Sequence, residues 1–105
     1  MPQTDTFPER SVMGWGNRGW VEIVETILEI CENGALKTHI MYRCNLNSKQ
    51  IAQYLRFLED HRLITTITEP PASKRPIFTT AELGKKYMNA YRQLENIFKK
   101  RSNME

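Results

Sequence analysis

The sequence predicts a mainly helical α+β fold, and three features of its residue pattern support this class. Apolar residues recur at helical spacing in three segments before residue 62, and helical spacing returns near the C-terminus. Between these regions, β-branched residues concentrate in two short segments. The 105 residues suit a single domain with one modest core, which leaves no room for a separate catalytic lobe.

The first predicted helix begins after an N-terminal arm. Residues 1–17 contain two prolines and two glycines and show no periodicity, so we expect a flexible arm there. From Arg18 the apolar spacing becomes that of an amphipathic helix, with glutamates on its other side and Asn33-Gly34 as its end. Its apolar positions are Trp20, Ile23, Val24, Ile27, Leu28 and Cys31.

Two further helices are predicted, the second over 38–44 and the third from Asn47 to about His61. Asn47 can cap the third helix because its side chain can accept a backbone hydrogen bond. The inward face of this helix carries Ile51, Tyr54, Leu55 and Leu58. At 100° per residue, Lys49, Gln53 and Arg56 fall within about 40° of the opposite pole.

The remaining chain predicts a β-hairpin and a final helix. Residues 63–69 are rich in β-branched side chains, the loop PPASKRP cannot continue a strand, and 77–79 resume extended structure. Lys74 and Arg75 give the loop a basic tip. Thr80 is expected to open a helix of about twenty residues. Three helices, a two-stranded wing and a C-terminal helix form the order of a winged helix-turn-helix domain.

Charge is divided unevenly along the chain. The formal net charge is +3, but residues 1–36 hold six acidic and two basic side chains, so the rest of the chain carries +7. A basic surface of this kind suits a polyanionic partner. A solvated basic surface without a partner is the alternative.

One segment resembles a known family. Residues 34–50 are similar to the "K-T-x-I-M-Y-x-x-N-L" signature of small archaeal winged helix-turn-helix proteins, and they read GALKTHIMYRCNLNSKQ. Residues 78–85 resemble the start of the last helix in these proteins. The resemblance covers about residues 18–98. It implies a DNA-binding protein that dimerises through its C-terminal helix, either a transcription regulator or a chromatin-type protein, and it implies no catalytic residues. The N-terminal arm lies outside the pattern.

The predicted DNA contacts lie on the third helix, residues 48–61, and on the basic wing. Ser48, Lys49 and Gln50 are expected to lie deepest, because recognition helices usually lead with their N-terminal end. Lys37 and Arg43 are expected to contact phosphates, and the wing to reach the minor groove. The full predicted set is Lys37, Arg43, Ser48, Lys49, Gln50, Gln53, Arg56, Lys74 and Arg75. The alternative is the solvated face of an amphipathic helix.

An aromatic and aliphatic stripe on the last helix predicts a homodimer. A terminal helix of this length extends beyond what a small core can cover, and exposed apolar stripes are rarely left bare. The predicted interface is Tyr87, Met88, Tyr91, Leu94 and Phe98. The alternative is that the stripe packs on the first helix of its own chain. The predicted division is an arm over 1–17, a DNA-binding domain over 18–80 and a dimerisation element over 81–105.

Other function classes find little support in the sequence. We expect no enzyme, cofactor or small-molecule ligand, because no phosphate-binding glycine loop or nucleophile motif occurs. Cys31, Cys44, His39 and His61 lack zinc-site spacing, and a redox switch at the two cysteines ranks low because buried thiols are usually inert. A protein-binding winged-helix adaptor remains an alternative. Without a signal or membrane segment, a cytoplasmic, nucleoid-associated location is expected.

Overall fold

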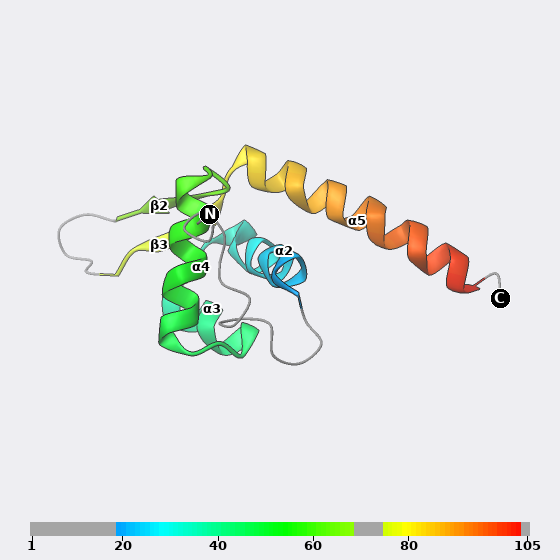
Figure 1. Ribbon diagram of the computed structural model, residues 1–105. Helices are drawn as coiled ribbons and strands as arrows, with labels where there is room; N and C mark the ends of the chain where they lie inside the picture. The colour runs from blue at the N-terminus through cyan, green and yellow to red at the C-terminus, as the bar shows by residue number, and fades with distance from the viewer. Residues whose placement is uncertain (1–18, 69–74, 104–105) are drawn as a thin grey trace, which may run out of the picture.

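The structure is a computed structural model that describes residues 19–68 and 75–103, with side chains described up to residue 98 (Figure 1). It confirms the α+β, mainly helical winged-helix class. The elements in chain order are α2 (Trp20–Ile30), the 3-10 turn η2 (Cys31–Asn33), β1 (Ala35–Leu36), α3 (Lys37–Cys44), α4 (Ser48–Asp60), β2 (Ile64–Ile67), β3 (Ile77–Thr80) and α5 (Glu82–Asn103).

The core lies between α2, α3, α4 and the small sheet. The predicted inward stripes of the first and third helices are confirmed, because each of their apolar positions apart from the half-exposed Trp20 is buried. Tyr54 is the largest fully buried side chain, and Ile40 and Cys44 bring α3 into the same cluster. Within the described residues, no helix combines the length and apolar character needed to cross a membrane.

The turn between α3 and α4 is fixed by local hydrogen bonds. Asn45 adopts a left-handed backbone conformation with φ of 57°, which ends α3. The predicted cap at Asn47 is confirmed, since its side-chain oxygen accepts from the Gln50 backbone N–H at 2.8 Å. In return, the Gln50 side-chain oxygen accepts from the Asn47 backbone N–H at 2.8 Å. This capping box sets the direction in which α4 leaves the turn.

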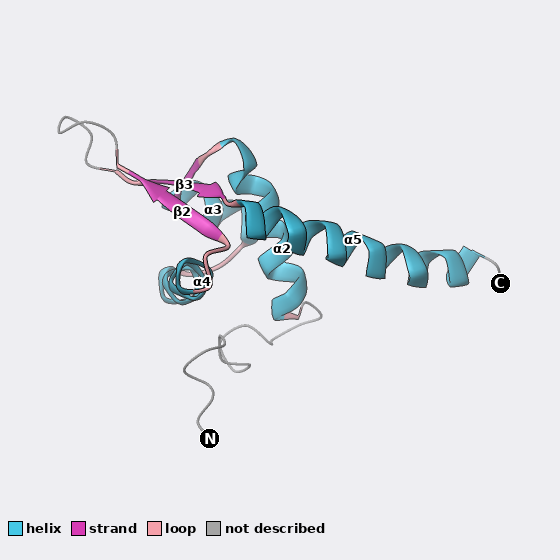
Figure 2. Cartoon of the chain, turned by 90° about the horizontal axis from the view of Figure 1, so that it is seen from above, coloured by secondary structure: helices cyan, strands magenta, loops and turns pink. Residues whose placement is uncertain are grey.

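The sheet has three antiparallel strands in the order β1-β3-β2. β2 and β3 are the predicted hairpin, and they lie beside α4 (Figure 2). β1 was not predicted, because two residues are too short to show alternation. Its pairing of Leu36 with Ile77 ties the start of α3 to the base of the wing.

The start of α5 is held tightly against the domain. The sequence places this start at Thr80, whereas Thr80 closes β3 and donates its hydroxyl to the Leu28 carbonyl at 2.6 Å. Gly84 is buried, and a Cβ there would lie 2.3 Å from the Leu63 carbonyl oxygen. Beyond its first half, α5 projects away from the other elements (Figures 1 and 2). The chain is accordingly elongated, measuring 56 × 31 × 25 Å.

Candidate nucleic-acid interface

The outer face of α4 presents the polar side chains that the sequence assigns to it. Lys49 and Arg56 are exposed and Gln53 is partly covered by the domain, so none of the three side chains is buried. Seven residues separate Lys49 from Arg56, which corresponds to about 10 Å along the helix axis. That length matches about three base-pair steps of 3.4 Å in a duplex.

The two neighbouring residues at the N-terminal end of α4 differ from each other. Ser48 is exposed, as a groove contact requires. Gln50 is only 6% exposed, and its side-chain oxygen closes the capping box. The prediction that Gln50 lies deepest in a groove does not fit this burial. In the structure the Gln50 side chain caps α4, and the Asn-x-x-Gln spacing of a capping box could have identified this role in the sequence.

Exposed basic residues also occur on α3 and just before β3. Arg75 is exposed just before β3, and Lys74 lies outside the described residues. Because Leu36 pairs with Ile77, the exposed Lys37 at the start of α3 lies near the base of the wing. Arg43 is exposed in the last turn of α3. Every cationic residue that was predicted to bind DNA and that the structure describes is therefore accessible to a partner.

Tyr42 is an exposed aromatic residue that the sequence analysis did not single out. Its side chain is 78% exposed on α3, more than any other large apolar or aromatic side chain in the described chain. The buried positions Ile40 and Cys44 place Tyr42 on the outer side of that helix. Helical spacing within α3 could have identified it.

The predicted dimer stripe on α5 divides into two parts. Met88 is 2% exposed and belongs to the core, while the half-buried Tyr87 donates its hydroxyl to the Val21 carbonyl at 2.7 Å. Tyr91 is also half-buried. For Met88 the prediction of an intermolecular contact is wrong, because its own chain covers it. The distal part stays open, with Leu94 54%, Ile97 53% and Phe98 65% exposed.

Charged side chains join α2 to α5 away from the outer face of α4. Arg92 lies 3.5 Å from Glu25 and 4.0 Å from Glu29. Burial raises the pKa of the Glu25 carboxyl, and the nearby Glu29 raises it further, although Arg92 opposes both effects. Burial likewise raises the pKa of the Tyr87 hydroxyl. These groups serve the packing of α5 on α2.

Comparison with known proteins agrees with this geometry. A family model described as winged helix-turn-helix matches residues 17–99. The chain belongs to the winged helix-turn-helix family. No curated protein sequence matches it significantly.

Several solved structures share this winged helix-turn-helix fold. Sso10a-2 of Sulfolobus solfataricus, described as a DNA-binding protein, is 29% identical with a TM-score of 0.65, covering 83% of this chain and 85% of that one. A PadR family transcription regulator of Clostridium difficile is 19% identical with a TM-score of 0.68, covering 78% and 95%. A mutant of S. aureus MepR bound to an oligodeoxyribonucleotide is 14% identical with a TM-score of 0.67, covering 81% and 62%. The last two similarities concern the fold alone.

The core of this winged helix-turn-helix chain contains two cysteines. Cys31 and Cys44 are buried thiols, and burial raises the pKa of Cys31 to about 12, with Cys44 adding to the shift. The reactive thiolate of Cys31 is therefore disfavoured at neutral pH. No cluster of three or more His, Cys, Asp or Glu suited to a metal occurs in the described part of the chain.

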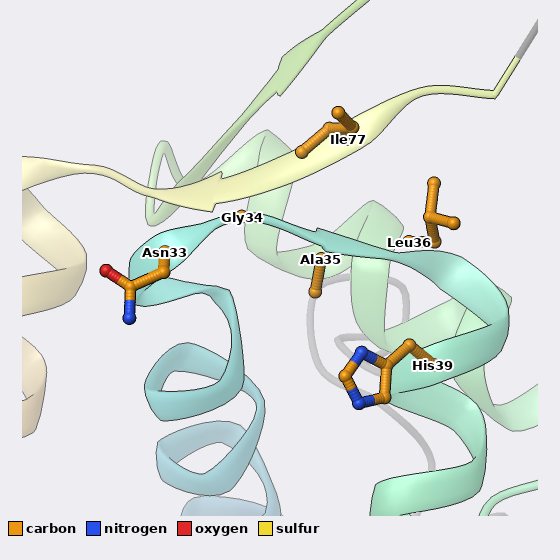
Figure 3. A pocket seen from close by; sticks show the side chains of 6 residues that line it. All are labelled: Asn33, Gly34, Ala35, Leu36, His39 and Ile77. Carbon is orange, nitrogen blue, oxygen red and sulfur yellow. The ribbon is translucent and has the colours of Figure 1, made fainter.

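A small open pocket of about 240 Å³ lies beside β1 and the start of α3 (Figure 3). It is lined by Asn33, Gly34, Ala35, Leu36, His39 and Ile77. Among the described residues that line it, Asn33 and His39 supply the polar side chains.

Proposed function

We propose that this chain binds double-stranded DNA as a homodimer and acts as a transcription regulator of the small archaeal type, associated with the nucleoid. The observation that carries the proposal is the accessible row of Lys49, Gln53 and Arg56 on α4. In a winged helix-turn-helix protein the second helix of the motif enters the major groove. A row of cationic and amide groups there can reach both base edges and phosphates.

Basic residues around α4 would hold the duplex through its phosphates. Lys37 and Arg43 lie on α3, the helix that crosses the backbone in helix-turn-helix complexes. Lys74 and Arg75 belong to the loop between β2 and β3, where arginine is favoured by the negative potential of the minor groove. The excess of positive charge after residue 36 supports the same partner.

The distal half of α5 supports the homodimer. Leu94, Ile97 and Phe98 are each more than half exposed on a part of the helix that projects from the domain. Burying such a stripe against its counterpart in a second copy removes apolar surface from water. Two copies would also present two recognition helices to the two half-sites of a duplex.

The comparisons support the proposal from outside the chain. Sso10a-2 is described as a DNA-binding protein, and MepR was solved with an oligodeoxyribonucleotide. Both carry the fold described above over most of this chain.

A titration with random-sequence duplex over a range of salt concentrations tests the function. Each phosphate neutralised contributes about −0.9 to the slope of log affinity against log salt. Four such contacts would lower the affinity about a hundredfold between about 50 and 200 mM salt. Absence of binding even at the lowest salt would refute the proposal and favour a protein-binding adaptor.

A further inference from the structure

The outer face of α4 carries groups of different hydrogen-bonding character. Lys49 and Arg56 only donate, whereas the amide of Gln53 both donates and accepts. Ala52 precedes Gln53 in the sequence and lies about 100° from it around the helix axis, where it is exposed and presents a methyl group. The other amide of the helix, Gln50, is buried in the capping box. Of the two glutamines in α4, the structure therefore leaves Gln53 to face a ligand.

Base pairs in the major groove differ in the pattern that such groups can recognise. Adenine presents an acceptor at N7 and a donor at N6, which match the donor and acceptor of a glutamine amide. Thymine presents a C5-methyl group, which makes apolar contact with an alanine methyl. Guanine presents two acceptors, N7 and O6, which suit a lysine or an arginine.

Position along α4 places Gln53 between the two cations. Lys49 lies four residues before it and Arg56 three residues after it, which corresponds to about 6 and 4.5 Å along the axis. Each of these spacings is on the order of one to two base-pair steps. Arg56 and Lys49 can therefore bind a guanine or a phosphate on either side of the pair that Gln53 meets.

We propose that Gln53 determines base preference by hydrogen-bonding adenine, with Ala52 against a thymine methyl, so that α4 selects an A·T pair at the centre of its contact. This inference rests on the proposed function, since it presumes that α4 enters the major groove. It adds to that function the base chemistry that the helix recognises. The sequence prediction assigned Lys37 and Arg43 to phosphates, but it assigned no residue of α4 to a particular base.

The test begins with selection of bound duplexes from a random library by the full chain. The selected half-site should contain an A·T pair, and its replacement by G·C should weaken binding at least about fivefold. Gln53→Ala should reduce this discrimination between A·T and G·C to less than about twofold. The variant protein should still fold, because alanine favours a helix. Gln93→Ala is the matched control, because Gln93 is an exposed glutamine on α5. It should keep the full preference.

Chemical substitution of the base identifies the contact itself. Replacing the selected adenine by 7-deazaadenine removes the N7 acceptor, and this should weaken binding by the wild type but not by Gln53→Ala. If Gln53→Ala retains the A·T preference, or if the wild type binds all duplexes within about twofold, the inference is overturned while DNA binding stands. Failure of the wild type to bind any duplex would instead refute the proposed function.

Discussion

Among the glycines that the structure describes, Gly84 is the one at which an added methyl group would meet the closest neighbouring atoms. In Gly84→Ala the new Cβ would lie 2.3 Å from the Leu63 carbonyl oxygen, 2.7 Å from Thr80 Cγ2 and 3.1 Å from Leu28 Cδ2. The first of these is a backbone atom, which cannot move aside like the end of a flexible side chain. The start of α5 must therefore shift away from β3 and α2.

One favourable and two unfavourable contributions determine the change in the free energy of unfolding. Alanine in a helix interior is favoured over glycine by about 1 kcal/mol. Overpacking costs about 1–3 kcal/mol, and the shift weakens hydrogen bonds worth about 1 kcal/mol each. Two of these bonds lie at this junction, from the Thr80 hydroxyl to the Leu28 carbonyl at 2.6 Å and from the Ala81 N–H to the Leu63 carbonyl at 2.9 Å. We expect a net loss of about 2–3 kcal/mol.

Thermal and urea unfolding, followed by far-ultraviolet circular dichroism, measure this loss. At about 4–8 °C for each kcal/mol, Tm should fall by roughly 10–20 °C. Asn89→Ala is the control, because Asn89 is exposed on the same helix and its replacement should leave stability unchanged or slightly raised. If Gly84→Ala were as stable as the wild type or more so, the close approach of α5 to Leu63 would be refuted.

Three further predictions concern the dimer, the half-buried Glu25 carboxyl and the helix cap. Phe98→Asp should convert a dimer to a monomer in light scattering while the fold persists, because Phe98 is 65% exposed within one chain; an unchanged mass would exclude this stripe as the interface. Since burial raises the pKa of Glu25, the folded protein binds that proton more tightly than the unfolded chain, and stability is lost as pH rises through the folded pKa. Glu25→Gln should therefore gain stability relative to the wild type as pH rises from below the ordinary value of 4.5, in urea unfolding at several pH values; a constant difference would contradict the shift. Asn47→Ala should cost about 1 kcal/mol in urea unfolding, because it removes the capping box, and a loss near zero would show that the cap contributes little.

The sequence predicts those parts of the fold that depend on local pattern. The stripe of α4 and its cap at Asn47 follow from spacing and residue type within one segment, and the structure confirms both. β1 could not be predicted, because its two residues become a strand only through pairing with β3. The need for glycine at position 84 is likewise set by Leu63, far away in the sequence.

The candidate site was predictable in part for the same reason. The outward direction of Lys49, Gln53 and Arg56 follows from the helical period, and the structure leaves these side chains accessible. The burial of Gln50 accompanies its hydrogen bond to the Asn47 backbone N–H, which the Asn-x-x-Gln spacing indicates but side-chain type alone does not. Met88 and Leu94 share one apolar stripe in the sequence, and only the packing of α5 on α2 separates the buried residue from the exposed one.

The central claim is that the outer face of α4 binds a DNA duplex. A comparison of Arg56→Glu with Lys85→Glu tests this claim most directly. Both substitutions change the charge by the same amount, but Arg56 lies on α4, whereas Lys85 lies on α5, 4.0 Å from the exposed Glu82. In duplex titrations at one salt concentration, Arg56→Glu should weaken binding by more than about 1 kcal/mol and Lys85→Glu should have little effect. Equal losses for the two variants would contradict the orientation of the domain on DNA.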